Sequence, residues 1–182
     1  MKLEVDSITK LVESSSTVLV LGVTGTGKST LLESVYEKLK SKYKAGSLVF
    51  YIFDFTRVEF LTWKEDPYLG LPVIYDLEKS ADLLKGLCGQ KFNKRTIIHI
   101  EECDLAYYDI STLEAIWLQA KSDKNLTVIF TTSRPSKEAL TDNILNNTDQ
   151  RILFKLSTAE QSKRFFGADG VQKLGKGEFV IN

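Results

Sequence analysis

Short apolar runs rich in β-branched and aromatic residues recur along the chain, and segments with a helical period separate them. The runs predict strands at Thr17–Leu21, Leu48–Asp54, Thr96–Glu101, Leu126–Thr132, Arg151–Leu156 and Glu178–Ile181. Alternation of strands with helices is typical of α/β proteins, in which helices cover the faces of a parallel sheet. The pattern therefore predicts an α/β fold with a mostly parallel central sheet flanked by helices.

Two of the intervening segments place their apolar residues on one helical face, as sheet-covering helices do. One face comprises Leu31, Leu32, Val35, Tyr36 and Leu39, and the other comprises Ile110, Leu113, Ile116 and Trp117. A capping box in which Ser157 and Glu160 each satisfy a backbone amide predicts a further helix that runs to about Phe166. Trp63–Pro72 and Gly86–Lys94 are predicted to be exposed loops.

Length and composition favour one domain spanning residues 1–182, since no internal repeat or Pro/Gly-rich linker divides the chain. The 24 basic and 24 acidic residues cancel, so any contact with nucleic acid requires a local basic patch. Cys88 and Cys103 lack CxxC partners, which argues against a zinc site or a disulfide framework. No apolar stretch reaches the length of a membrane span, and Met1–Asp6 lacks a signal-peptide core. We therefore expect a cytoplasmic protein without a membrane segment.

A glycine-rich loop follows the strand Thr17–Leu21 and leads into a helix. Its residues are Gly22, Val23, Thr24, Gly25, Thr26, Gly27, Lys28, Ser29 and Thr30. Such glycines let backbone amides surround a β-phosphate, while Lys28 reaches the β/γ oxygens and the Ser29 hydroxyl binds Mg²⁺. The dipole of the following helix also favours an anion. The pattern predicts a binding site for ATP and Mg²⁺ rather than a glycine turn with an incidental lysine.

A second motif is the apolar strand Thr96–Glu101, which ends in the paired carboxylates Glu101 and Glu102 and resembles a Walker B strand. In a parallel sheet this strand end lies near the phosphate loop. We predict that Glu101 holds the water shell of Mg²⁺ and that Glu102 orients and polarises the attacking water. The alternative is a strand end with two solvated acids.

A third strand, Leu126–Thr132, continues into Ser133 and Arg134, whose polar groups we interpret as a candidate sensor of the γ-phosphate. The alternative is a strand followed by a Pro-containing turn. His99, the single histidine, lies within an apolar strand and is predicted to be a hydrogen-bonded core residue. Cys103 is assigned no chemistry, because free cysteines are commonly small buried apolar residues.

Several further segments extend the pattern from about Val18 to Ile181. They are Tyr51–Phe60, Leu71–Asp76, Ile98–Glu102, Thr132–Ser136, Asn147 with Arg151–Ser157, and Leu174–Phe179. In this order the motifs resemble the motor domain of the FtsK/SpoIIIE and HerA group, which are ring-forming ATPases that pump double-stranded DNA. Glu101 replaces the usual Walker B Asp, and Ser133 replaces the usual sensor Gln.

The resemblance implies a RecA-like P-loop NTPase fold of the ASCE type, with the sensor strand between the phosphate-loop strand and the Walker B strand. It further implies ATP hydrolysis with Mg²⁺, double-stranded DNA as partner, and a homo-oligomeric, hexameric ring. Nucleotide at a subunit boundary would receive an arginine from the neighbouring subunit, for which Arg151 and Arg134 are the candidates. The short chain resembles genome-packaging ATPases of tailless viruses, so a capsid portal or a conjugation or segregation protein is a possible partner, and the host cytoplasm is the expected location for a viral protein.

Two other functions stay open. The altered sensor at Ser133 is compatible with a nucleotide-binding assembly subunit that has little turnover. A P-loop small-molecule kinase would need an Arg-rich lid, whereas the arginines of this chain are scattered. For a DNA motor, Lys121, Lys124 and Lys137 are candidates to line a central pore.

Overall fold

A six-stranded sheet forms the centre of the computed structural model, which describes residues 5–57, 60–104 and 109–182. The strands are β1 (Thr17–Leu21), β2 (Leu48–Phe53), β3 (Arg95–Ile100), β4 (Leu126–Thr132), β5 (Gln150–Phe154) and β6 (Phe179–Ile181). Their order in the sheet is β2-β3-β4-β1-β5-β6, and only the last pair is antiparallel. Met1–Glu4 at the amino terminus and Val58 and Glu59 of the family-like segment lie outside the described residues.

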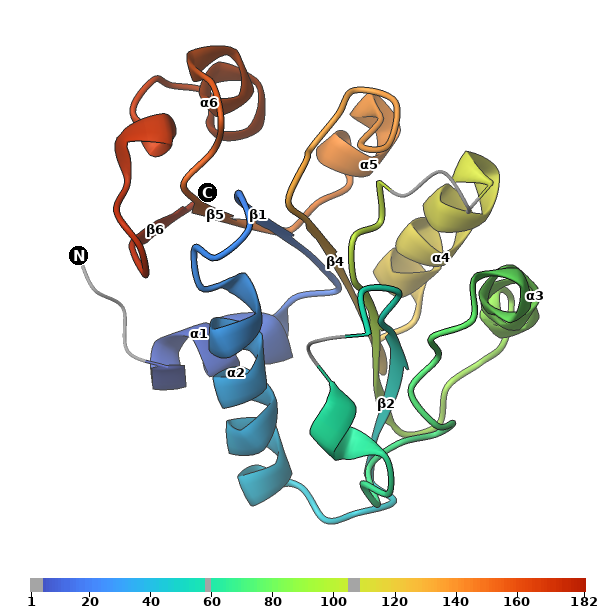
Figure 1. Cartoon of the computed structure of the whole chain (residues 1–182). Coiled ribbons are helices and arrows are strands. Elements are labelled where there is room, and N and C mark those ends of the chain that lie inside the picture. The colour runs from blue at the N-terminus through green and yellow to red at the C-terminus, as the bar shows by residue number, and fades with distance from the viewer. Residues whose placement is uncertain (1–4, 58–59, 105–108) are drawn as a thin grey trace.

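Helices cover both faces of this sheet, as Figure 1 shows. The helices are α1 (Val5–Ser14) and α2 (Lys28–Lys42) on one face, and α3 (Leu77–Leu87), α4 (Ile110–Ser122), α5 (Asp142–Asn146) and α6 (Ala159–Phe166) on the other. The alternation of side chains along β1 produces this division, because Val18 and Val20 pack with the first group while Leu19 and Leu21 pack with the second. The α/β fold predicted from the sequence is confirmed.

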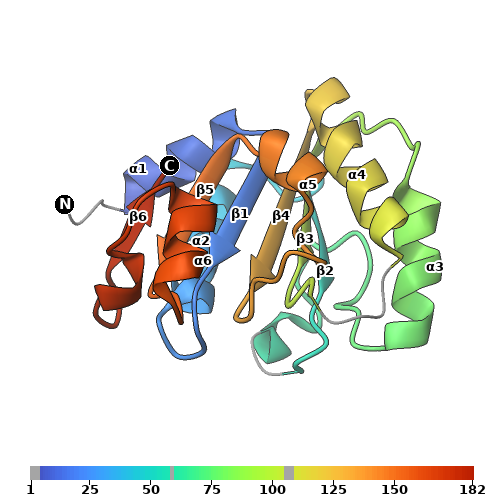
Figure 2. The ribbon, with the colours of Figure 1, turned by 90° about the horizontal axis from the view of Figure 1, so that it is seen from above.

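The position of β4 between β1 and β3 confirms the strand order that the family resemblance implied. All three strands are parallel, so their carboxyl ends meet at one edge of the sheet. Figure 2 shows the arrowheads of β1 and β4 at this edge. The loops that carry the predicted phosphate and acidic motifs are thereby brought together. No helix of the described part has the length and apolar character needed to cross a membrane.

The prediction that Trp63–Pro72 is an exposed loop is wrong in part. Trp63 ends the 3₁₀ turn η1 (Leu61–Trp63), is 5% exposed, and packs edge-on against Phe50 at 5.5 Å between ring centroids. The Lys40 ammonium lies 3.4 Å from the centre of its ring. Gly70 donates its N–H to the Phe50 carbonyl, so this segment also covers the outer edge of β2. Burial of the Trp63 ring and hydrogen bonding to the backbone groups at the edge of β2 both favour the packing of this segment against the sheet.

The predicted start of α6 is one residue too early. Thr158, not Ser157, is the N-cap, and its hydroxyl accepts from the amide of Gln161 at 3.1 Å. The Gln161 side chain in turn accepts from the Ser157 amide at 3.1 Å, a role that the capping box gave to Glu160. Thr and Gln side chains accept hydrogen bonds from amides at a helix start as Ser and Glu do, so the sequence is compatible with two adjacent starts of this helix. The helix ends at Phe166 as predicted.

Candidate functional site

The loop after β1 is fastened to the strands on both sides of it. Gly22 donates its N–H to the Thr132 carbonyl at 3.2 Å, and Val23 donates to the Lys155 carbonyl at 2.8 Å. A Cβ atom on Gly22 would lie 2.6 Å from the Cβ of Phe154, closer than side chains pack. Glycine is therefore required at this position by the approach of β5, and the loop is held rigidly at the carboxyl edge of the sheet.

The loop then turns tightly into the first turn of α2. Gly25 and Gly27 have φ angles of 77° and 110°, in the region that glycine adopts without steric cost. Gly27 is the N-cap of α2, and the amino group of Lys28 donates to the Gly22 carbonyl at 2.8 Å. The Thr26 hydroxyl closes the turn by donating to Val23. A glycine turn at a helix start, with a lysine across it, is the geometry that binds phosphate.

A cavity of about 400 Å³ lies over this loop and brings most of the predicted nucleotide and acidic residues together. Its lining comprises Thr24, Gly25, Gly27, Lys28, Ser29 and Thr30 from the loop, Glu101 and Glu102 from the end of β3, and also Thr56 and Lys176. Gly22, Val23 and Thr26 form the base of the loop instead. Neither Thr56 nor Lys176 was predicted to belong to the site. Both lie in segments that resemble the family, Tyr51–Phe60 and Leu174–Phe179, but neither segment by itself indicates a position beside the phosphate loop.

Glu101 is 3% exposed and faces several groups that favour its charged form. Burial raises the pKa of this carboxyl, but the nearby His99, a hydrogen bond from the Thr131 hydroxyl and the charge of Lys28 together hold the pKa below its ordinary value. His99 Nε2 lies 3.0 Å from Glu101 Oε2, although its N–H does not point at that oxygen. Glu101 is therefore an ionised carboxylate at neutral pH.

The residues present fit a magnesium ion that arrives with a nucleotide. The Ser29 hydroxyl and the ionised Glu101 line the same cavity, and Mg²⁺ prefers such hard oxygen ligands. Among the described residues, no group of three or more His, Cys, Asp or Glu side chains is placed to hold a metal by itself. Mg²⁺ usually completes its coordination with phosphate oxygens and water, so Ser29 and Glu101 are sufficient as the protein's share.

His99 is fully buried, as predicted, and its ring packs edge-on against Tyr36 and Phe60 at centroid distances of 5.8 and 5.4 Å. The prediction that it is hydrogen-bonded is supported only by the contact of Nε2 with Glu101, which is poorly aligned, while Nδ1 has no hydrogen-bond partner among the described residues. Its contact with Glu101 is a short approach between Nε2 and a carboxylate oxygen. The residue belongs to the aromatic packing under the site and does not line the cavity.

Glu102 has a left-handed backbone, with φ of 49°. This conformation is uncommon for a residue with a side chain and costs about 1 kcal/mol or more. Its amide donates to the Thr131 hydroxyl at 3.3 Å, and its Oε2 accepts from the Ser133 amide at 2.7 Å. These bonds hold Glu102 against the carboxyl end of β4, and its side chain still lines the cavity. The two neighbouring carboxylates therefore have different environments.

Ser133 and Arg134 follow β4 at the same edge but do not line the cavity. Ser133 is 8% exposed and reaches the site through the amide that holds Glu102. The side chain of Arg134 is 73% exposed, with Nε 3.8 Å from the Asp104 carboxylate. Asp104 also accepts from the Thr132 hydroxyl at 2.5 Å. Arg134 is thus a loosely paired cation that projects from the nucleotide edge of the sheet.

Arg151 is the second residue of β5, the strand next to the edge strand β6, and it is in register with Leu19 of β1. Its guanidinium donates to the Leu145 carbonyl at 2.8 Å and to the Phe165 carbonyl at 3.1 Å. These bonds tie the ends of α5 and α6 to β5. The structure does not bring Arg151 to the cavity, and its donors are directed into the fold.

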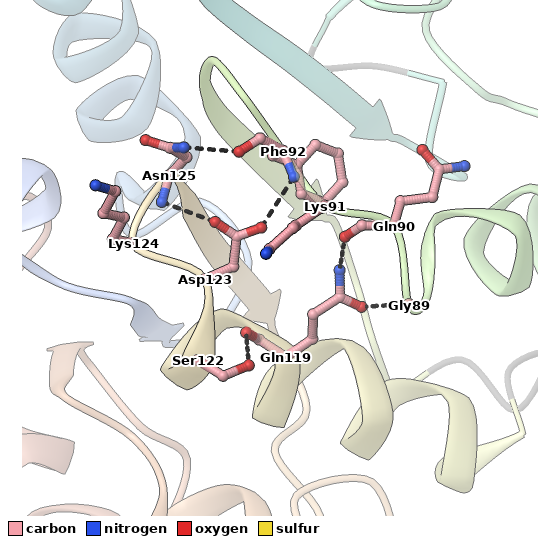
Figure 3. A pocket seen from close by; sticks show the side chains of 9 residues that line it. All are labelled: Gly89, Gln90, Lys91, Phe92, Gln119, Ser122, Asp123, Lys124 and Asn125. Carbon is pink, nitrogen blue, oxygen red and sulfur yellow. Dashed lines mark hydrogen bonds between the residues drawn. The ribbon is translucent and has the colours of Figure 1, made fainter.

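A second cavity, of about 490 Å³, lies at the opposite edge of the sheet, between the loops that precede β3 and β4 (Figure 3). It is larger than the phosphate-loop cavity, but its polar side chains bond to the surrounding backbone. Gln119 accepts from Gly89 and donates to Gln90, both at 2.7 Å, while Asp123 accepts from Phe92 at 2.9 Å. These bonds hold the loop before β3 against the end of α4. The phosphate-loop cavity is therefore the better candidate for a functional site.

A phosphate loop, an acidic strand end and the strand β4 between them define a P-loop NTPase of the RecA-like type. The chain belongs to the FtsK/SpoIIIE family, whose sequence model matches residues 4–177. It is 23% identical to the DNA translocase FtsK of Helicobacter pylori (strain J99), over 90% of this chain and 23% of that protein. The chain therefore spans about a quarter of the length of this curated relative.

Solved structures share the fold. The pCW3 conjugation coupling protein TcpA, in its monomer form with ATPγS, superposes with a TM-score of 0.69 at 20% identity, over 94% of this chain and 58% of that chain. The genome-packaging NTPase B204 of Sulfolobus turreted icosahedral virus 2, with ATPγS, gives 0.66 at 18% identity, over 93% and 92% of the two chains. At these identities the likeness shows the fold alone.

Proposed function

We propose that this chain is the ATPase motor of a ring that moves double-stranded DNA, using the free energy of ATP hydrolysis. The observation that carries the proposal is the cavity of about 400 Å³ in which Lys28 and the phosphate loop face Glu101 and Glu102. ATP hydrolysis requires a cationic loop that binds the phosphates and a carboxylate that activates water, and both line this cavity.

Each residue then has a defined task in hydrolysis. The amides of the loop from Thr24 to Ser29 and the Lys28 ammonium bind the β- and γ-phosphates and stabilise charge in the transition state. Mg²⁺ held by Ser29 and Glu101 would neutralise phosphate charge. Glu102, held by the Ser133 amide through one oxygen, accepts a proton from the attacking water through its carboxylate.

Family membership and the named functions of similar proteins support DNA as the partner. They include a DNA translocase, a conjugation coupling protein and a genome-packaging NTPase. The last of these has a chain of similar extent, since the alignment covers 92% of it. We place the motor in the cytoplasm, or in the host cytoplasm for a viral protein, with a capsid portal or a conjugation or segregation protein as its partner.

The ring is part of the proposal because the site has few arginines of its own. No arginine lines the phosphate-loop cavity among the described residues, so the charge of the γ-phosphate would be completed by a neighbouring subunit. Arg134 is the better of the two candidates, since it is exposed at this edge whereas Arg151 is bonded within the fold. A hexamer would repeat this boundary six times.

Steady-state release of phosphate, measured with and without double-stranded DNA, tests the function. The motor predicts turnover that DNA stimulates. Tight ATP binding without turnover under both conditions would instead identify a nucleotide-binding assembly subunit. Turnover that requires an added phosphoryl acceptor would identify a kinase, and either result would overturn the proposal.

A further inference from the structure

The turn before β6 is docked on the phosphate loop. Gly177 donates its N–H to the Thr26 carbonyl at 2.9 Å, and a Cβ atom on Gly27 would lie 3.7 Å from the Cα of Gly177. Figure 1 shows the same proximity, with the chain before β6 running beside the loop that follows β1. Residues more than a hundred positions apart in sequence therefore share one wall of the cavity.

This turn is held in shape by its own bonds. Gly175 donates its N–H to the Glu178 carboxylate at 2.8 Å, and the Glu178 amide donates to the Gly175 carbonyl at 3.2 Å. The acid nearest to Lys176 in sequence is thus bonded to the backbone. A fixed turn presents the side chain at its tip with little loss of backbone freedom.

Lys176 stands at that tip, lines the phosphate-loop cavity, and is exposed. In the described part of the chain it has no ion pair and no side-chain hydrogen bond, unlike Lys28, which is bonded to Gly22. An unpaired ammonium beside a glycine loop is placed to meet a phosphate, because the anion would supply the partner that the protein does not.

We propose that Lys176 is a second nucleotide-binding cation, which contacts the phosphate chain of ATP from the side opposite the acidic strand end. The inference rests on the proposed function and adds a residue to its site. Because Lys176 lies in the turn before β6, this contact would connect that strand to the bound nucleotide. The ligand class is a nucleoside polyphosphate.

The test compares the ATP affinity of the full chain with that of three variants by titration calorimetry at low and high salt. Lys176→Ala should weaken ATP binding about fivefold at low salt, as expected for one exposed charged contact. The difference should shrink at high salt, because exposed charges are screened. Lys176→Arg should retain the affinity. Lys173→Ala is the matched control, since this lysine is exposed on the same segment but does not line the cavity.

Steady-state kinetics give a second readout, in which Lys176→Ala raises KM and leaves kcat nearly unchanged. ATP affinity equal to that of the wild type would overturn the inference. So would a loss that is the same at both salt concentrations, or one that Lys173→Ala reproduces. A thermal melt shows whether each variant is folded. Lys28→Ala separates the two proposals, because ATP binding that survives this change would sink the proposed site itself.

Discussion

Glu101 and Glu102 are adjacent in sequence but lie in different surroundings, and this difference assigns their roles. Glu101 is buried against His99 and Thr131 and has a lowered pKa, so it remains charged and can act on a cation. Glu102 turns away through its left-handed backbone and is held by the Ser133 amide. A carboxylate at the cavity wall with one oxygen fixed is suited to orient a water molecule.

We predict that Glu102→Gln preserves ATP binding and slows hydrolysis by about 10²-fold or more, because an amide cannot accept the proton from water. Calorimetric ATP titration and phosphate release measure the two effects separately. Glu101→Gln is the paired control and should weaken the dependence on Mg²⁺. If Glu101→Gln abolishes turnover with normal Mg²⁺ dependence while Glu102→Gln is nearly silent, the two roles are reversed.

The buried Lys28 is the residue on which nucleotide binding depends most directly. We predict that Lys28→Ala lowers turnover by about 10²-fold or more, because the ammonium that offsets β/γ-phosphate charge is lost. Phosphate release at saturating ATP measures the effect. Lys91, which lines the cavity at the opposite edge, provides the control, and Lys91→Ala should hydrolyse ATP normally. Wild-type rates in Lys28→Ala would refute the site.

At the scale of the elements, the strands were predictable because each is a compact apolar run. Their observed bounds lie within two residues of the predicted ones, and all seven residues of β4 are buried. Helices α1, α3 and α5 were not predicted. The N-cap of α3 is Asp76, whose side chain accepts from the amides of Glu78 and Lys79. Ile8 and Val12 of α1 lie four positions apart, Leu84 and Leu87 of α3 lie three apart, and all four are buried, so the helical period of these apolar residues could have predicted both helices.

The connection between β5 and its helices gives a prediction at this scale. Arg151 donates to the carbonyls of Leu145 and Phe165, at the ends of α5 and α6. Arg151→Ala should lower the free energy of unfolding by about 1–3 kcal/mol, because both carbonyls lose their charged donor. Urea denaturation measures the loss. Arg134→Ala should leave stability nearly unchanged, since its side chain is exposed. Equal stability of both variants would contradict this role of Arg151.

At the scale of the whole molecule, the phosphate loop and the acidic pair could be predicted because their residues are local in sequence. Thr56 and Lys176 could not, since the topology alone brings the turn after β2 and the turn before β6 to the same cavity. The environment of His99 was equally hard to predict, because its ring contacts come from Tyr36 of α2 and from Phe60, both distant in sequence. Contacts between segments that are distant in sequence depend on the tertiary fold, so a local sequence pattern does not predict them.

The oligomeric ring yields the last prediction. Subunits of Arg134→Ala keep an intact phosphate loop, whereas subunits of Lys28→Ala keep the arginine. If Arg134 acts across the boundary, mixing two nearly inactive variants should restore activity at boundaries that combine a good loop with a good arginine. At random equal mixing, about a quarter of the boundaries have this combination, so we expect on the order of a quarter of wild-type turnover.

The experiment measures phosphate release in mixtures of the two variants, at concentrations where light scattering shows mixed rings. A mixture of Arg151→Ala with Lys28→Ala is the comparison, and it should show no gain beyond the activity of its Arg151→Ala subunits, because that arginine is bonded inside its own subunit. Absence of recovery with Arg134→Ala in verified mixed rings would refute Arg134 as the donor in trans. Hydrolysis per chain that does not depend on protein concentration would argue against the ring, because a site completed by a neighbour must weaken as subunits dissociate.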